Sequence, residues 1–197
     1  MRHPGRVRII AGRWRRRLLP IPDAQDLRPT PDRVRETLFN WLAAELPGAR
    51  CLDLFAGTGV LGFEAASRGA SRVVLVERDQ RVAAHLVQLA ASLGAEQVQV
   101  VCGDGPTWAL SARERFDVLF VDPPYARIDV AALLARLEQR GVLAAHARVY
   151  VEGPADAAGV LPPSWQCLRE QRAGRVRYHL LAPPKASAIP PEAAGSL

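Results

Sequence analysis

The run Asp122-Pro123-Pro124-Tyr125 offers the most specific chemistry in the chain. It follows an apolar segment, so we expect it to begin the loop after a buried strand, at the edge where parallel sheets bind ligands. The two prolines fix φ and remove two backbone donors, which makes the loop stiff. Asp122 and the carbonyl of Pro123 would accept the two N–H bonds of an exocyclic amine, and Tyr125 would stack on the ring, a contact worth ~1–3 kcal/mol. This set predicts a planar substrate with an amino group.

A glycine-rich run, Asp53-Leu54-Phe55-Ala56-Gly57-Thr58-Gly59-Val60-Leu61-Gly62, follows an apolar segment and opens a helix. Gly57 and Gly59 allow a sharp turn and a close approach of the backbone to a ligand, which the first amides of the helix would face. The last six residues of the run also match the dinucleotide fingerprint. Asp53 argues against a dinucleotide because its carboxylate would repel a pyrophosphate. It favours a ligand that carries an ammonium group, such as the methionine part of S-adenosylmethionine.

Two further acids lie where a nucleoside could be held. Glu77 ends an apolar run and comes 18 residues after Gly59, close to the ~20-residue spacing of an acid that binds ribose hydroxyls. Asp104 follows the next apolar segment and could accept the exocyclic amino hydrogens of an adenine. The alternative for Asp104 is a turn residue between two glycines, and for Glu77 an ordinary acid at the end of a strand.

The elements that must position these residues alternate between strand and helix patterns. We expect strands at 51–55, 72–77, 97–101, 117–121, 147–152, 166–171 and 175–181, and helices at about 59–68, 79–92, 105–112 and 128–140. An earlier helix should begin at Pro31 with Thr30 as its N-cap. The alternation predicts an α/β fold with a seven-stranded, mostly parallel sheet. The last two strands should form an antiparallel hairpin centred on Ala173-Gly174.

The net charge of +6 comes entirely from the first quarter of the chain. Residues 1–50 hold 11 Arg and 5 acids, whereas residues 51–197 hold 15 basic and 15 acidic residues. This distribution is typical of a polyanion-binding arm on a neutral domain. Alternating apolar and basic residues predict a short β-hairpin around Gly12. Trp14 could stack on a base or anchor the hairpin to the domain, and the sequence leaves both open.

The motifs that contain Asp53, Glu77, Asp104 and Asp122 resemble those of class I S-adenosylmethionine-dependent methyltransferases that act on amino nitrogens. The resemblance implies a Rossmann-like class I methyltransferase fold with S-adenosylmethionine as its cofactor. Among such enzymes, the Asp-Pro-Pro-Tyr sequence is the specific part.

Two N-terminal stretches narrow the resemblance. Residues 8–15 and 27–42 look like the bacterial 16S ribosomal RNA guanine-N2 methyltransferase family, and the similarity runs from about residue 6 to residue 181. Ala11 departs mildly from the family, which often has glycine there. The resemblance implies N2 methylation of one guanine in 16S ribosomal RNA, within the assembled small subunit.

The motifs and the resemblance together assign roles to individual residues. The expected catalytic residues are Asp122, Pro123, Pro124 and Tyr125. The expected cofactor-binding residues are Asp53, Phe55, Gly57, Gly59, Glu77, Arg78, Asp104 and Thr30. The expected RNA-binding residues are Arg6, Arg8, Arg13, Trp14, Arg15, Arg16, Arg17 and Arg28. We expect no metal site, because the three cysteines have irregular spacing.

The same observations divide the chain into four parts. We expect an RNA-binding basic hairpin at 1–18, a linker at 19–31, the methyltransferase domain at 32–181 and a flexible tail at 182–197. No apolar run approaches the ~18 residues of a membrane span, and no signal-peptide pattern precedes the domain. The three irregularly spaced cysteines favour a reducing, cytoplasmic compartment. We also expect a monomer.

Three other functions compete with this interpretation. A DNA amino-methyltransferase would use the same motifs, but 197 residues leave no room for a separate target-recognition domain. A methyltransferase of glutamine side chains usually has Asn where Asp122 stands. A non-catalytic RNA-binding assembly factor would not need the intact set of motif residues.

Overall fold

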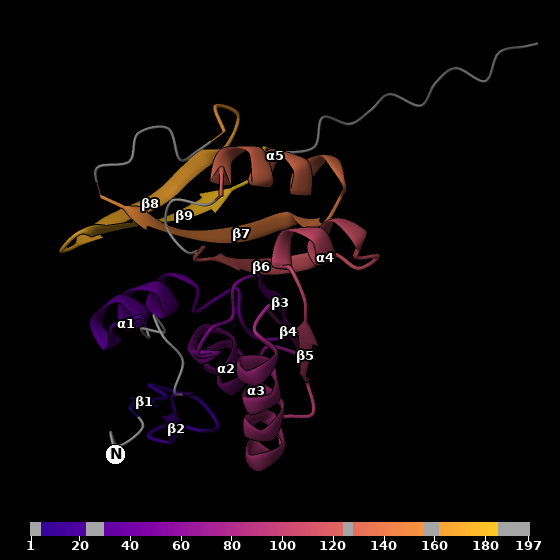
Figure 1. The fold of residues 1–197 in the computed structure, drawn as a ribbon. Helices are drawn as coiled ribbons and strands as arrows, with labels where there is room; N and C mark the ends of the chain where they lie inside the picture. Colours follow the sequence, from indigo (N-terminus) through magenta and orange to yellow (C-terminus); the bar gives the residue numbers. More distant parts are fainter. Residues whose placement is uncertain (1–4, 23–29, 124–127, 156–161, 185–197) are drawn as a thin grey trace, which may run out of the picture.

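A seven-stranded sheet forms the centre of the protein (Figure 1). The computed structural model describes residues 5–22, 30–123, 128–155 and 162–184. The strand order is β5-β4-β3-β6-β7-β9-β8. The strands are β3 (Arg50–Asp53), β4 (Arg72–Glu77), β5 (Val98–Cys102), β6 (Phe116–Val121), β7 (Leu143–Pro154), β8 (Gln166–Ala173) and β9 (Val176–Ala182). From β5 to β7 the neighbours are parallel, and β9 is antiparallel to both β7 and β8. The predicted mostly parallel sheet with an antiparallel C-terminal hairpin is confirmed.

Helices cover both faces of the sheet. They are α1 (Asp32–Trp41), α2 (Val60–Ser67), α3 (Gln80–Leu93), α4 (Gly105–Ser111) and α5 (Val130–Gln139). Helices α1, α2 and α3 pack on one face, and α4 and α5 pack on the other, as Figure 1 shows for α1 and α5. In β4, Val73 and Leu75 face the first layer while Val74 and Val76 face the second. This alternation explains why the central strands are continuously apolar, because both of their faces are buried.

The strand order reverses at β3, which has β4 on one side and β6 on the other. After β3 the chain passes through α2 to β4 on one side and then through α3 to β5. It next passes through α4 and adds β6 on the other side of β3. Open α/β sheets bind ligands at such a switch point, outside the carboxyl ends of the strands. The loops after β3 and β6 are the two that carry the glycine-rich run and Asp122.

Several details of the predicted elements are wrong. The strand predicted at 147–152 is longer and runs from Leu143 to Pro154. The N-cap of α1 is Pro31, whose carbonyl accepts the first helical N–H bonds, from Val34 and Arg35. Thr30 makes no side-chain cap, and its carbonyl accepts a hydrogen bond from Arg35 Nε at 3.1 Å. The turn between β8 and β9 consists of Gly174 and Arg175, one residue later than predicted, because Gly174 adopts a positive φ of 62° there.

The predicted N-terminal hairpin is present as β1 (Arg6–Arg8) and β2 (Leu18–Pro20), paired antiparallel. The alternating stretch at Trp14-Arg15 predicted the second strand there, but the strand begins later, at Leu18. Residues 9–17 instead form a compact loop, in which the Arg16 N–H donates to the Ile9 carbonyl at 2.9 Å. Among the described residues, no helix is both long enough and apolar enough to span a membrane.

Candidate active site

Four carboxylates lie at the carboxyl ends of neighbouring strands. They sit on the face of the sheet that carries α1, α2 and α3, since each lies two residues from a side chain of that core layer. They are Asp53 on β3, Glu77 on β4, Asp122 after β6 and Glu152 on β7. The topology therefore brings together three predicted site acids and one that the motifs did not identify.

Asp53 is 2% exposed, although it is a carboxyl group. Its pKa is raised to about 7, mainly by burial and in part by the charge of Glu77, while backbone hydrogen bonds from Phe55 and Gly62 oppose the rise. A buried acid of this kind becomes easier to ionise when a cation is placed beside it. The Asp53 environment thus favours a positively charged ligand.

Asp122 is half-buried beside the end of β3. Its pKa is raised well above the ordinary value, first by burial and then by the charges of Glu152 and Asp53. Pro123, the next residue, is buried. The other two residues of this motif, Pro124 and Tyr125, lie outside the described residues, so their predicted roles stay predictions.

Glu77 ties two loops of the site together. Its Oε2 accepts the Gly57 N–H at 2.8 Å, and its Oε1 accepts the Asp79 N–H at 2.8 Å. Each carboxylate oxygen keeps a second lone pair, so these bonds leave acceptor capacity for ribose hydroxyls. They also fix the carboxylate in place before any ligand arrives.

Gly59 shows why the turn before α2 requires glycine. It is the N-cap of α2 and has a φ of 72°, in the left-handed region that side chains disfavour. A Cβ at this position would lie 2.7 Å from Leu86 Cδ2. The turn therefore brings α2 against α3 while its N-terminal amides face the strand ends.

The loops after β4 and β5 meet at Asp104. The Gly103 N–H donates to the Glu77 carbonyl at 2.9 Å. Asp104 Oδ1 accepts from the Thr107 backbone N–H at 3.0 Å and from its hydroxyl, which makes Asp104 the N-cap of α4. These two bonds lower the pKa of Asp104, and the nearby exposed Arg78 adds to the effect. Asp104 is thus both a helix cap and an ionised acceptor at the edge of the site.

The remaining two expected cofactor residues lie on either side of the sheet. Phe55 is partly buried and packs against the core layer of α4 and α5. Thr30 is 7% exposed and is held beside α1 by Arg35.

The N-terminal hairpin is docked on α2 by a buried glutamate. Glu64 is 0% exposed and accepts the N–H groups of Ile10 at 2.7 Å and Ala11 at 3.0 Å. Arg68 Nε donates to it at 2.7 Å, and Arg35 Nη1 lies 3.7 Å from it. Because two cations and two amides surround its carboxylate, Glu64 joins the hairpin, α1 and α2.

Ser67 completes this docking at the C-terminal end of α2. Its hydroxyl donates to the Ala11 carbonyl at 2.6 Å and accepts the Trp14 N–H at 3.0 Å. A Cβ at Gly12 would lie 1.9 Å from the Ser67 carbonyl oxygen, so only glycine fits. The hairpin is therefore part of the folded core.

The arginines of the hairpin point to solvent while its apolar side chains are buried. Trp14 is 6% exposed and packs in the core, a position that favours the anchoring alternative. The exposed residues are Arg6, Arg8, Arg13, Arg15, Arg16 and Arg17; Arg28 lies outside the described residues. The loop docks at the C-terminal end of α2, about 12 Å along that eight-residue helix from the strand ends.

Glu152 and Tyr150 are the site residues that sequence reasoning missed. Glu152 is 7% exposed, and the Tyr150 hydroxyl donates to its Oε2 at 2.8 Å. The signal was present, because the strand predicted at 147–152 ends in Val-Tyr-Val-Glu, an apolar run followed by a glutamate like the run that ends at Glu77. Only the three-dimensional pairing of β6 with β7 shows that Glu152 neighbours Asp122.

Comparison with known proteins places this arrangement in a family. A family model described as conserved hypothetical protein 95 matches residues 7–182. The chain is 44% identical over 177 residues to the Escherichia coli K12 protein named ribosomal RNA small subunit methyltransferase D, covering 89% of each chain. The chain belongs to this family.

Two further proteins extend the similarity. The protein of the same name from Haemophilus influenzae is 41% identical over 180 residues, which cover 89% of this chain and 93% of that one. A solved structure of a candidate methyltransferase from Escherichia coli has a TM-score of 0.84 and 41% identity, and covers 92% of this chain and 99% of that chain. The Rossmann-like methyltransferase fold expected from the sequence is confirmed.

Proposed function

We propose that this protein transfers a methyl group from S-adenosylmethionine to the exocyclic N2 of a guanine in 16S ribosomal RNA. Family membership supports methylation of small-subunit ribosomal RNA, because the relatives are named as methyltransferases of that RNA. The observation that carries the choice of an amino nitrogen is the carboxylate of Asp122, held beside Asp53 and followed by the buried Pro123. These acceptors suit an amine that has two N–H bonds to donate.

The residues at the ends of β3 and β4 fit S-adenosylmethionine. Asp53 is a buried acid whose raised pKa would fall toward its ordinary value beside an ammonium group. Glu77 is fixed by two backbone amides and can accept the two ribose hydroxyls. When bound, S-adenosylmethionine supplies an electrophilic methyl group on a sulfonium.

The chain contributes mainly position and charge. Asp122 and the Pro123 carbonyl would accept the amine N–H bonds and hold the nitrogen lone pair toward the methyl group, and such orientation is a large part of catalysis. As the N–C bond forms and the S–C bond breaks, positive charge develops on nitrogen and the Asp122 carboxylate stabilises it. The methylated ammonium is acidic, and Asp122, with its raised pKa, can take the released proton.

The target guanine must leave any helix to reach these residues. An amine within a base pair is out of reach, so the nucleotide must be flipped or lie in a loop. The exposed arginines of the N-terminal hairpin supply a surface for phosphates on the flank of the site.

Labelled S-adenosylmethionine tests this function directly. The substrates are small-subunit particles and free 16S ribosomal RNA from cells that lack the gene, with duplex DNA alongside. We expect N2-methylguanosine in the RNA, and its loss in Asp122→Asn but not in Glu96→Gln, an exposed acid before β5 at the opposite edge of the sheet. Label in DNA alone would contradict the ribosomal substrate, and another methylated nucleoside would contradict the guanine amine.

A further inference from the structure

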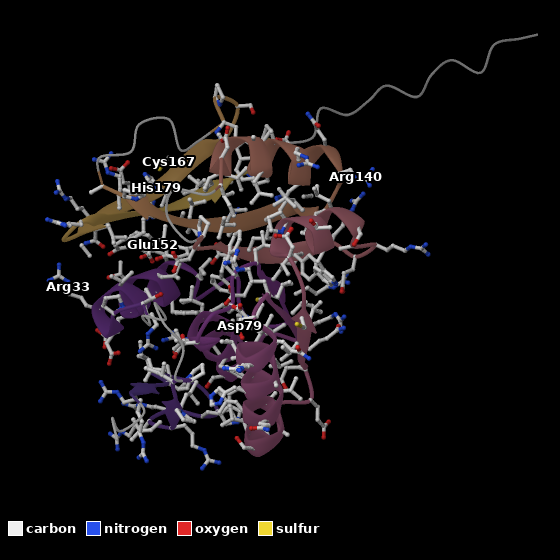
Figure 2. All side chains as sticks on the ribbon, viewed as in Figure 1. Arg33, Asp79, Arg140, Glu152, Cys167 and His179 are labelled. Carbon is white, nitrogen blue, oxygen red and sulfur yellow. The ribbon has the colours of Figure 1, made fainter. Side chains whose placement is uncertain are left out.

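Glu152 lies next to Asp122 on the neighbouring strand. Val121 of β6 pairs with Val151 of β7, so the residue after each faces the same side of the sheet. Phe120 and Tyr150, two residues earlier, share that side and have ring centroids 6.5 Å apart. Figure 2 labels Glu152 where β7 and β9 face α1.

The Glu152 carboxylate is held in a fixed orientation. Tyr150, 0% exposed, donates its hydroxyl to Oε2 at 2.8 Å. The Tyr150 ring packs against Tyr178, with centroids 6.2 Å apart, and Tyr178 packs against Trp41 at 5.5 Å. An acceptor supported by such a rigid aromatic group is preorganised for binding.

Two carboxylates side by side match one nucleobase edge better than the others. Guanine presents the ring N1–H directly beside its exocyclic amine, so two adjacent donors face the protein. Adenine and cytosine present a ring nitrogen lone pair beside their amine, which a carboxylate would repel. The repulsion between Asp122 and Glu152, which contributes to the raised pKa of Asp122, is relieved when donors lie between them.

We propose that Glu152 reads the target base as guanine by accepting its N1–H, while Asp122 accepts an N2–H. This inference rests on the proposed function and adds the residue that sets base specificity. Tyr150 is then a positioning residue, because it acts only through the Glu152 carboxylate. A site built to bind a donor rejects analogues that lack it, because its acceptor is left unpaired.

The test changes the base and residue 152 together. The guanine that the wild-type protein methylates is mapped first, and small-subunit RNA is then prepared with guanosine or 2-aminopurine ribonucleoside at that position. 2-Aminopurine keeps the exocyclic amine but has a lone pair at N1. We expect the wild-type protein to methylate guanosine about tenfold to a hundredfold faster than 2-aminopurine, and this ratio of rates measures base specificity. In Glu152→Gln the amide can donate to N1, so this ratio should fall by about tenfold or more while 2-aminopurine is still methylated.

Two variants separate base reading from folding. Glu170→Gln alters a glutamate on β8 whose side chain is 50% exposed, and it should leave the ratio unchanged. Tyr150→Phe keeps both carboxylates but loses the orienting bond, so it should lower the ratio by less than Glu152→Gln. Retained methylation of 2-aminopurine shows that a variant is folded.

The outcomes distinguish the two proposals. If the wild-type protein methylates no guanine in small-subunit RNA, the proposed function fails. If it methylates guanosine and 2-aminopurine at similar rates, or if Glu152→Gln slows both substrates equally, the proposed function stands and Glu152 does not read the base.

Discussion

Glu64 and Asp122 are carboxylates on the same side of the sheet, and their surroundings are opposite. Glu64 accepts two backbone N–H groups and the Arg68 guanidinium, and it lies beside Arg35. Asp122 instead lies near Glu152 and Asp53, whose charges raise its pKa. Removing an acid that has cations around it destabilises a fold because a buried charge is left unpaired, whereas buried acids that face one another repel and can be removed without that cost. Glu64 therefore holds the hairpin in place, whereas the acids around Asp122 are arranged for a ligand with positive charge and N–H donors.

The largest effect that we expect is on folding, at Glu64. Glu64→Gln removes the negative charge that faces Arg68 and the buried Arg35, although Arg35 keeps its ion pair to Asp32 at 2.6 Å, and it replaces a carboxylate oxygen that accepts a backbone N–H. Removing one member of a buried charged network in this way costs about 3–5 kcal/mol. Chemical denaturation would measure the loss of unfolding free energy. Glu96→Gln, an exposed acid, is the control and should change it little. If Glu64→Gln were as stable as the wild-type protein, the structural role of Glu64 would be refuted.

The next effect is on catalysis, at Asp122. Asp122→Asn keeps the shape of the side chain but removes the charge that stabilises the developing ammonium, so methyl transfer should fall by about 10²–10³-fold. Cofactor binding should largely survive, because Asp53 and Glu77 are unchanged. Single-turnover transfer and calorimetric titration with S-adenosylmethionine would measure the two properties. Equal loss of both would rule out this role for Asp122.

A third effect is the pH dependence that Asp53 imposes on the ligand-free protein. Its pKa rises from 3.8 when unfolded to about 7 when folded, so the folded state favours the protonated form. The stabilisation is complete below pH 4 and is lost as the pH rises toward 7, by about 2 kcal/mol between pH 5 and 7. Asp53→Asn should remove this component from the denaturation profile. S-adenosylmethionine should bind more tightly as the pH rises through 7, because Asp53 ionises; pH-independent affinity would contradict its role.

The smallest effect concerns the surface that Glu64 holds in place. Arg15 and Arg16 are exposed on the hairpin loop. Replacing both with Gln should weaken RNA binding modestly and reduce the salt dependence of affinity by about one for each lost phosphate contact. Binding titrations at several salt concentrations would show this. An unchanged slope would mean that the loop arginines do not contact phosphates.

Much of the sheet and its strand-end acids could be predicted, because buried parallel strands leave continuous apolar runs that end in polar residues. Glu77 illustrates this, since its strand was predicted with the observed bounds. The strand before the glycine-rich run was predicted at 51–55, but it ends two residues earlier, so that Asp53 is its last residue. The α1 cap at Thr30 was wrong because any threonine before a proline matches the capping pattern, whereas Arg35 takes its carbonyl.

Other features depend on contacts between distant segments. Arg35 is completely buried, and no local pattern marks an arginine that will pair with a glutamate 29 positions later in the sequence, Glu64. The sequence left open whether Trp14 stacks on a base or anchors the hairpin, and only its burial in the folded protein favours the anchoring role. Glu152 could be recognised as a site residue only from the pairing of β6 with β7. The sequence predicts a mostly parallel sheet, but it does not predict which strands are neighbours.

The unfolding free energy of Asp122→Asn at pH 7, without ligand, shows whether the acids at the strand ends serve a ligand or the fold. If the acids at the strand ends are arranged for a ligand, an amide at position 122 removes the cost of burying a carboxyl group beside Glu152 and Asp53, and this variant should be at least as stable as the wild-type protein. A loss of several kcal/mol, comparable to that of Glu64→Gln, would show that Asp122 supports the fold, and it would contradict the distinction between the two carboxylate groups.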